Sequence, residues 1–326
     1  MATLKDIAAE CGTSIATVSY VLSGHGEERR ISAAMQERVV RAAEKLNYDI
    51  ASRGRTSGRP GIAVYWPQKQ MDALLPSVIT GINNAISMAP MMVDVVIHPF
   101  EMGCLADQNT LWMPGRCGAS VVISAADEDI AALERNKTPF PTVLLNRTAE
   151  NCSSVSIDHE EAGRLAAEFA IERGGDDVTL VVPNIVVAGP SFRSRAVLDT
   201  FDDRGRKPRE TIACGIEIND GYALGWKLVL DKRVPSVVLS ICDTVALGIS
   251  EAFKEAGFKL NEDVEIVSMS TSYKSANARL LRDLTIVDLR QVEVTTLAMN
   301  VAITLAKRGN RENRTVVLHP QMIAHL

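Results

Sequence analysis

The sequence lacks the features that mark membrane, secreted and metal-dependent proteins. No run approaches the ~20 uninterrupted apolar residues that a membrane helix needs, and residues 1–6 contain no apolar segment of a secretory signal. The six cysteines lie far apart, without a C-x-x-C pair and without a histidine at ligand spacing. These absences argue against a disulfide framework and a zinc site, and they predict a cytoplasmic protein without a metal or cofactor.

Motifs of common enzyme classes are also missing. No G-x-G-x-x-G follows a strand-like run, and neither G-x-x-x-x-G-K-[ST] nor G-x-S-x-G occurs. The five histidines are scattered without triad or metal spacing, so each is expected to be solvated or structural: His25, His98, His159, His319 and His325. We therefore predict that the chain is not an enzyme.

What is present is a globular composition with an uneven charge. The chain has 326 residues, a length that favours two or three domains. Of these residues, 46% are hydrophobic and 23% are charged. The net charge of −5 would argue against nucleic acid, yet residues 1–60 hold nine Lys or Arg against seven Asp or Glu. The remainder then carries −7, so the chain has a small basic head on an acidic body.

The first residues have the pattern of three short helices. Thr3 to Asp6 fits a capped helix start, and Gly12 ends the helix that follows. Thr13 or Ser14 can cap a second helix that ends at Ser23-Gly24, and a third runs from about Ser32 to Asn47. Two helices joined by a tight turn containing glycine indicate a helix-turn-helix, although an ordinary three-helix interaction module has the same pattern.

In a helix-turn-helix the second helix enters the major groove of DNA. Its outward positions here are Ile15, Ala16, Ser19 and Tyr20, of which Ile15 and Ala16 can read only apolar features such as the thymine methyl. Hydroxyl side chains beside them are candidates for phosphate contacts. The predicted DNA-contacting residues of the head are Thr3, Ser14, Ile15, Ala16, Thr17, Ser19, Tyr20 and Ser23.

Three blocks of the head resemble a known family. They are residues 3–8, Thr-Leu-Lys-Asp-Ile-Ala; residues 17–24, Thr-Val-Ser-Tyr-Val-Leu-Ser-Gly; and residues 42–48, Ala-Ala-Glu-Lys-Leu-Asn-Tyr. In order and spacing they closely resemble the headpiece of the lactose-repressor/galactose-repressor (LacI/GalR) family of bacterial transcription regulators. The resemblance implies that Ile15, Ala16 and Tyr20 lie where the family reads bases.

The segment after the head departs from that family. Residues 49–61 are rich in Gly, Ser and Arg, which indicates a flexible linker. Family members have a Pro-Asn pair there and a hinge helix with a leucine that kinks the operator, whereas this chain has Asp49-Ile50 and no leucine before Ile62. We therefore expect Arg53, Arg55 and Arg59 to contact phosphates or a narrow minor groove, with less DNA bending. Alternatively these arginines only solubilise a loop.

From Ile62 onward, β-rich runs alternate with helical stretches, which predicts parallel sheets with right-handed crossovers. The predicted strands are 62–66, 93–97, 119–124, 142–145, 178–182, 237–240 and 265–268. The predicted helices are 77–87, 128–135, 160–173, 193–204, 222–230, 245–256 and 291–308. About 265 residues exceed one lobe, so two lobes are expected, with a ligand cleft at the carboxyl ends of their strands.

The family resemblance continues in blocks of this body, such as 156–166 and 243–249, and implies effector-contacting positions. Arg193 matches an arginine that grips ligand hydroxyls or a carboxylate, and Asn146 matches a polar ligand contact. Cys242 stands where an asparagine is usual, and Ser270 where a segment normally supplies an aspartate. With two of four polar anchors changed, either the effector is not a typical sugar, or the protein responds to a partner or to nothing. Trp66 and Trp226 could stack on a ligand ring, although such residues are more often core packing.

These inferences predict an α plus α/β chain: an N-terminal three-helix helix-turn-helix headpiece at 1–48, a linker at 49–61, and a two-lobed periplasmic-binding-protein-like core at 62–326. We place lobe 1 at about 62–158 and 289–318, and lobe 2 at about 159–288 and 319–326. The predicted function is a repressor that binds a pseudo-palindromic DNA operator as a homodimer. Its DNA affinity is expected to be controlled by a small molecule in the cleft between the lobes, a sugar or related metabolite that can be atypical. The alternative is an α/β ligand-binding or enzyme-like protein whose N-terminal helices mediate protein contacts.

Overall fold

The computed structural model describes residues 3–22, 26, 29–46, 48, 61–68, 74–184, 188–272, 279–308 and 312–324. Several predicted features lie outside these residues. They are the end of the second helix at Ser23-Gly24, His25, the linker with Arg53, Arg55 and Arg59, and His325.

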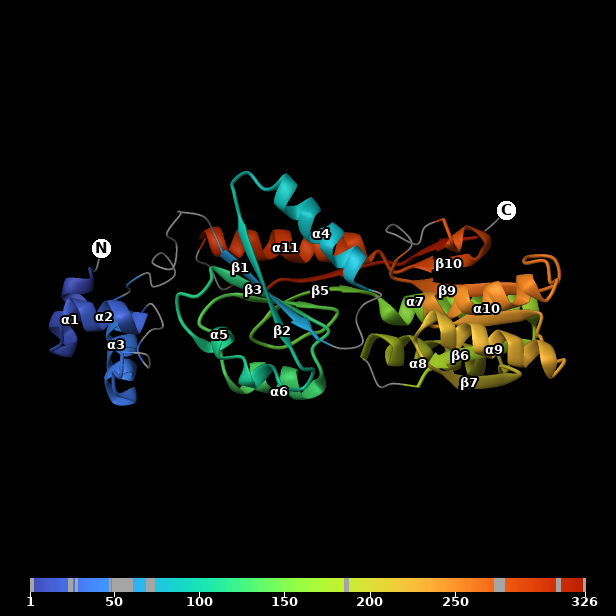
Figure 1. Cartoon of the computed structure of the whole chain (residues 1–326), viewed down its shortest axis with the longest axis horizontal. Coiled ribbons are helices and arrows are strands. Elements are labelled where there is room, and N and C mark those ends of the chain that lie inside the picture. The colour runs from blue at the N-terminus through green and yellow to red at the C-terminus, as the bar shows by residue number, and fades with distance from the viewer. Residues whose placement is uncertain are drawn as a thin grey trace. The chain divides into compact units, whose positions relative to one another are not determined.

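The head consists of α1 (Leu4–Cys11), α2 (Ile15–Leu22) and α3 (Ala33–Lys45), as predicted (Figure 1). Thr3 and Asp6 form a reciprocal capping box at the start of α1, and Gly12 ends the helix in the left-handed conformation with φ of 60°. Ser14 caps α2, because its Oγ accepts a hydrogen bond of 3.0 Å from the backbone N–H of Thr17. Apolar residues of all three helices form one core: Leu4, Ile7, Ala8, Cys11, Val18, Val21, Leu22, Val39, Ala42 and Ala43.

The first sheet has six strands in the order β11-β5-β4-β3-β1-β2. They are β1 (Gly61–Pro67), β2 (Asp94–Phe100), β3 (Ala119–Ile123), β4 (Thr142–Leu145), β5 (Ser153–Ile157) and β11 (Thr315–Leu318). β1 pairs in parallel with β2 and β3, and β3 in parallel with β4, as the alternation of strands and helices predicts. The short α5 (Asn109–Trp112) and α6 (Asp127–Arg135) lie on the same side of this sheet (Figure 1).

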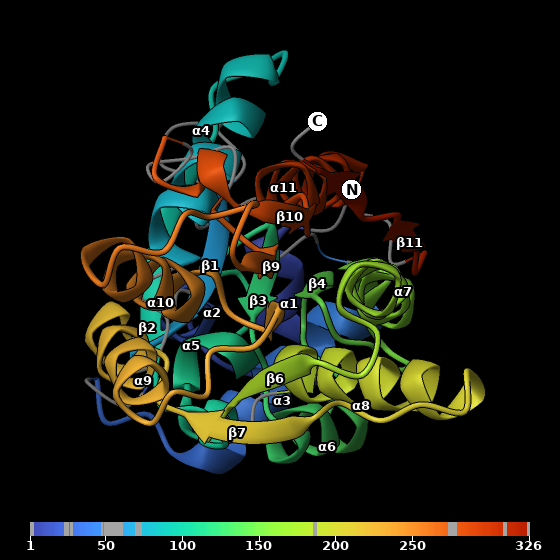
Figure 2. The same ribbon diagram turned by 90° about the vertical axis from the view of Figure 1, so that its right-hand side faces the viewer.

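The second sheet has the order β12-β10-β9-β8-β6-β7. Its strands are β6 (Val178–Pro183), β7 (Glu210–Cys214), β8 (Val237–Ser240), β9 (Glu265–Ser270), β10 (Thr285–Asp288) and β12 (Gln321–Ile323). The pairings of β6 to β10 are parallel, and β12 adds antiparallel to β10. Figure 2 shows α7 (His159–Gly174) and α8 (Ala188–Asp203) on one side, with α9 (Ile218–Leu230) and α10 (Asp243–Glu255) on the other. This is a doubly wound arrangement.

Two further helices, α4 (Leu75–Met88) and α11 (Gln291–Arg308), complete the body. By backbone contacts the chain divides into unit 1, of residues 1–69, 84–154 and 297–315, and unit 2, of residues 70–83, 155–296 and 316–326. The sequence analysis placed the corresponding divisions near 158, 288 and 318, and it assigned 70–83 to lobe 1. That segment belongs to unit 2, where a Cβ on Gly81 would lie 2.6 Å from Cβ of Thr295.

Candidate functional site

The helix α2 turns one face into the core of the head and the other into solvent. Val18, Val21 and Leu22 are buried, whereas Ile15 is 47% exposed and Tyr20 is 37% exposed. Ala16 between them is also exposed. Three of the four outward positions expected from helical spacing are therefore exposed in the folded head, and Ser19 is partly buried.

The hydroxyl groups at the helix starts of the head already make local hydrogen bonds. Thr3 Oγ1 donates to Asp6 Oδ2 at 2.7 Å, and this bond holds the pKa of the Asp6 carboxyl below its ordinary value. Ser14 Oγ and Thr17 Oγ1 lie 2.9 Å apart. If these residues contact phosphate, they do so with side chains that already form hydrogen bonds at a helix start.

The structure adds a cation to the outward face of α2 that helical spacing did not reveal. The guanidinium carbon of Arg29 lies 4.7 Å from the ring centroid of Tyr20, which is a cation–π distance. Arg29 comes from the segment between α2 and α3, so a pattern read along α2 alone could not find it. It places positive charge beside the residue predicted to read bases.

In unit 2 a buried polar group forms where the strands of the second sheet end. Cys242 and Asp243 follow β8 at the start of α10, and Ser270 ends β9. Asp243 Oδ2 accepts hydrogen bonds of 2.7 Å from Ser270 Oγ and 2.7 Å from Ser272 Oγ. Arg193 of α8 is 5% exposed, and its Nη1 lies 3.3 Å from Nδ1 of His159, the first residue of α7.

Burial sets the protonation of this group. Desolvation, helped by the charge of Arg193, lowers the pKa of His159 to about 3, so its ring is neutral near neutral pH. Desolvation lowers the pKa of Arg193 to about 10, against the opposing effects of Cys242 and Asp243, and the guanidinium stays charged. Burial also raises the pKa of the Cys242 thiol to about 11, so Cys242 is a neutral thiol.

Four of the six predicted effector residues belong to unit 2 and two belong to unit 1. Arg193, Cys242 and Ser270 belong to unit 2, and charge interactions or hydrogen bonds link each of them to Asp243. Trp226, also of unit 2, lies on α9 and hydrogen-bonds Tyr222, whose hydroxyl donates to Glu255 at 2.5 Å. Trp66 at the end of β1 and Asn146 after β4, with φ of 57°, belong to unit 1.

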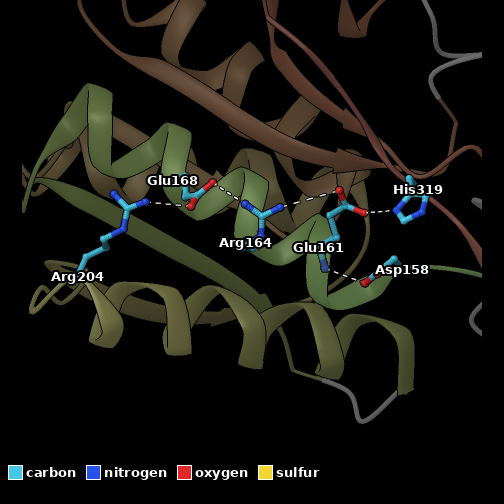
Figure 3. Close-up of polar contacts among 6 residues, drawn as sticks. All are labelled: Asp158, Glu161, Arg164, Glu168, Arg204 and His319. Atoms are coloured by element: carbon cyan, nitrogen blue, oxygen red, sulfur yellow. Dashed lines mark hydrogen bonds and ion pairs between the residues drawn. The ribbon is translucent and has the colours of Figure 1, made fainter.

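Sequence patterns did not predict a polar network that runs along α7. Figure 3 shows its members, which are Asp158, Glu161, Arg164, Glu168, Arg204 and His319. His319 Nδ1 lies 2.5 Å from Glu161 Oε2, and the hydrogen bond with Glu161 raises the pKa of His319. Glu168 accepts from Arg164 and from Arg204, the residue after α8, each at 2.9 Å.

The same network contains three groups of the type that binds metals. One ligand atom each of Asp158, Glu161 and His319 lies within 4.8 Å of the others. Spacing along the sequence could not show this, because 158 positions separate Glu161 from His319. In the structure these groups bond to protein atoms: Glu161 to His319, and Asp158 to the backbone N–H of Glu161 at 2.8 Å.

Comparison with protein families gives two matches. The model "Bacterial regulatory proteins, lacI family" matches residues 3–49, and "Periplasmic binding protein-like domain" matches residues 168–324. Together they account for more than half of the chain. The first falls on the head and the second on much of the second sheet with its helices.

Curated relatives cover the chain almost from end to end. The chain is 22% identical over 346 aligned positions to the HTH-type transcriptional repressor PurR of Pasteurella multocida, covering 99% of this chain and 97% of the relative. It is 22% identical to the lactose operon repressor of Escherichia coli, covering 84% of this chain and 77% of that repressor.

Solved structures share the fold. A LacI family transcription regulator from Clostridium acetobutylicum aligns with a TM-score of 0.74 at 21% identity, covering 82% of this chain and all of that one. A lac repressor dimer bound to operator and the anti-inducer ONPF aligns with a TM-score of 0.69 at 18% identity, covering 99% of this chain and 98% of that one. Among the described residues, none of the helices is long and apolar enough to span a membrane.

A helix-turn-helix head with an exposed second helix, followed by two doubly wound sheets, defines a DNA-binding transcription regulator with a ligand-binding type of core. The chain belongs to the LacI family of bacterial regulatory proteins. Members of this family are transcription regulators and not enzymes, in agreement with the absence of catalytic motifs from the sequence.

Proposed function

We propose that this protein is a cytoplasmic transcriptional repressor that binds a pseudo-palindromic operator as a homodimer and responds to a small-molecule effector. The observation that carries the proposal is the exposed face of α2, with Ile15, Ala16 and Tyr20 directed away from the core of the head. The relatives named repressors support it, as does the solved lac repressor dimer on its operator.

The chemistry of this face indicates how bases are read. Ile15 and Ala16 present carbon atoms, which suit the methyl group of thymine in the major groove. Tyr20 offers a hydroxyl and a ring, with Arg29 beside it to attract phosphate or a purine edge. We therefore expect an operator half-site with thymine opposite the start of α2.

A gel-shift assay tests this role of α2. Tyr20→Ala and Thr17→Ala should each weaken binding to a genomic operator fragment by about 1–3 kcal/mol, or roughly 5- to 150-fold. Ala34→Ser, an exposed change on α3, is the matched control and should leave affinity unchanged. If neither Tyr20→Ala nor Thr17→Ala weakens binding, α2 is not the recognition helix.

Dimerisation is proposed to use β2 and the end of α4. β2 is the last strand of its sheet, with Val96 54% exposed and Ile97 46% exposed, and Met88 and Met92 nearby are 70% and 63% exposed. An open strand edge with apolar side chains invites pairing, and a second copy of the chain would cover it by two-fold symmetry.

Light scattering after gel filtration tests that surface. Val96→Lys should shift the protein from dimer toward monomer, because two copies would bring the two lysines into one apolar interface. Thr148→Lys, on an exposed loop after β4, is the control and should remain dimeric. A dimer that is unaffected by Val96→Lys would place the interface elsewhere.

The proposed effector site centres on Arg193, Cys242 and Ser270 of unit 2. Asn146 remains a candidate by resemblance, and Trp66 and Trp226 remain candidates as rings that could stack on a ligand. A solved cellobiose complex of the regulator CelR, with a TM-score of 0.65, supports a small-molecule site in this fold. An effector that binds two arrangements of the core unequally would shift their populations and so change DNA affinity.

A further inference from the structure

The contact between Arg193 and His159 fixes which atoms of the imidazole ring carry hydrogen. A guanidinium can only donate, so His159 Nδ1, 3.3 Å from Arg193 Nη1, must accept. The ring is neutral, because burial and Arg193 lower the pKa of His159. Its single proton therefore lies on Nε2, which makes Nε2 a hydrogen-bond donor.

Two donors of this pair have no partner. Among the described residues, neither Nε2 of His159 nor Nε of Arg193 has a hydrogen-bond acceptor, and both atoms are buried. Arg193 as a whole is 95% buried, since it is 5% exposed. Buried donors of this kind are rare in folded proteins unless a ligand or water supplies the acceptor.

Asp243, whose charge acts on Arg193, already accepts several hydrogen bonds. Asp243 receives the hydroxyls of Ser270 and Ser272 and the backbone N–H of Ser272 on Oδ2, and the N–H of Thr244 on Oδ1 at 3.0 Å. Its charge favours the charged form of Arg193, yet no hydrogen bond joins the two among the described residues. Cys242 is a neutral thiol and only a weak acceptor.

Apolar surface lies beside the donors. Phe192 is 51% exposed, and its ring lies 6.4 Å from the His159 ring at an interplanar angle of 28°. Residue 189 is glycine, and a Cβ there would lie 3.3 Å from both Arg193 Nη1 and His159 Cε1. A side chain at this position would crowd the donor pair.

We propose that the effector of this protein carries a carboxylate, which accepts from Arg193 Nε and His159 Nε2 while its carbon body lies against Phe192. This inference rests on the proposed function, in which the Arg193 group is the effector site, and adds the class of ligand. A carboxylate only accepts hydrogen bonds and so matches a set of donors. A sugar hydroxyl also offers a donor, and the nearby carboxylate of Asp243 already accepts four hydrogen bonds.

Isothermal titration of the full-length protein tests the proposal with four carboxylates as probes: benzoate, phenylacetate, succinate and citrate. Benzamide and phenylacetamide are the neutral counterparts of the first two probes, and glucose, adenosine and inorganic phosphate represent other ligand classes. We expect saturable binding of at least one carboxylate, at least tenfold tighter than its amide where one exists, and no comparable binding of the other three.

Variants locate the binding. Arg193→Gln and Arg193→Lys should each weaken the carboxylate at least tenfold, since Lys keeps the charge but lacks the Nε donor, and His159→Gln should weaken it severalfold. Arg195→Gln, on an exposed part of the same helix, is the control. Operator binding without ligand should be present in the unaltered protein and in Arg195→Gln, which separates failure here from failure of the repressor assignment.

Three results would overturn the proposal. They are binding of glucose, adenosine or phosphate with no carboxylate binding, absence of binding by all four carboxylates, or carboxylate binding that survives both Arg193→Gln and Arg193→Lys in folded protein. Thermal unfolding of each variant shows whether it is folded. Operator binding is scored separately, so a repressor without a carboxylate effector is recognised as such.

Discussion

At the scale of single residues, the protonation state of His159 affects both the stability of the folded chain and the proposed ligand contact. The ring accepts from Arg193 and is kept neutral by burial, so protonation would place a second cation beside a buried guanidinium. The same environment that keeps Nε2 a donor therefore makes the folded chain sensitive to acid.

We predict that stability falls as pH drops below the ordinary His pKa of about 6.5. The folded pKa of about 3 is lower than the unfolded value, so the unfolded chain binds the proton first between these two values. The contribution of His159 is complete above pH 6.5 and is lost at up to about 1.4 kcal/mol per pH unit toward pH 3. Urea unfolding from pH 7 to pH 4 should show a shallower slope in His159→Gln.

His319 supplies the opposite sign as a control. Its bond to Glu161 raises the folded pKa, so its contribution is present below the unfolded pKa and is lost as pH rises through the raised value. His319→Gln should therefore leave the acid slope of the wild type in place. If His159→Gln and the wild type have the same acid slope, His159 is not the buried neutral group described here.

The sequence predicts some of these residues but not their protonation states or contacts. Arg193 was reached by resemblance, and the outward positions of α2 by helical spacing. The tautomer of His159 could not be predicted, because it depends on a contact with a residue 34 positions later, between two helices. Arg29 was missed for the same reason, since its contact with Tyr20 is tertiary and follows from no helical spacing.

At the scale of elements, Gly163 determines how closely α7 and α8 approach. A Cβ on Gly163 would lie 2.5 Å from Cβ of Ala196 and 2.7 Å from the backbone oxygen of Arg193. Both distances are shorter than van der Waals contact, and both neighbours belong to α8. The glycine thus lets α8 bring Arg193 next to His159, one helical turn before Gly163.

Gly163→Ala therefore has an expected sign opposite to helix propensity. In an open helix this change stabilises by about 1 kcal/mol. Here we predict destabilisation by about 1–3 kcal/mol, because the helices must move apart. Denaturant unfolding measures it, and Glu172→Ala, exposed on the same helix, should change stability by less than ~0.5 kcal/mol. Stabilisation by Gly163→Ala would show that α7 and α8 are not closely packed at this point.

Periodicity predicted elements with a continuous apolar or amphipathic run better than elements rich in polar residues. β8 and α11 have the predicted bounds of 237–240 and 291–308, because each is a continuous apolar or amphipathic run. β7 was absent from the predicted strands. It is an edge strand in which polar and apolar residues mix and only Cys214 is buried, so it has no continuous apolar run. The serine-rich β5 was missed because Ser153 and Ser154 are buried polar residues without an apolar signature.

At the scale of the whole molecule, the order of head and body along the sequence is enough to assign the family. The sequence is not enough to assign each segment of the body to one of the two units. Residues 70–83 join unit 2 because α4 contacts α11 and the residues after β9 there, as in the 2.7 Å bond from Ser77 Oγ to Thr271 O. These contacts join segments that are far apart in the sequence, so no local sequence pattern predicts them.

The linker leads to a prediction about the DNA. No leucine lies between Tyr48 and Ile62, so the sequence lacks the leucine that forms the minor-groove wedge in the family it resembles. We expect the operator to bend little, with Arg53, Arg55 and Arg59 contributing phosphate or minor-groove contacts. A circular-permutation gel shift measures the bend, and the Escherichia coli lactose operon repressor on its own operator is the control. A sharp central kink would contradict this account.

The central claim is that two copies of this chain read DNA through paired α2 helices. Selection of operators from a random DNA library with full-length protein, followed by footprinting, tests it most directly. The account predicts an enriched sequence of two inverted half-sites, protected on successive major grooves and no longer selected by Tyr20→Ala. Enrichment of a single unpaired half-site, or no enrichment at all, would contradict it.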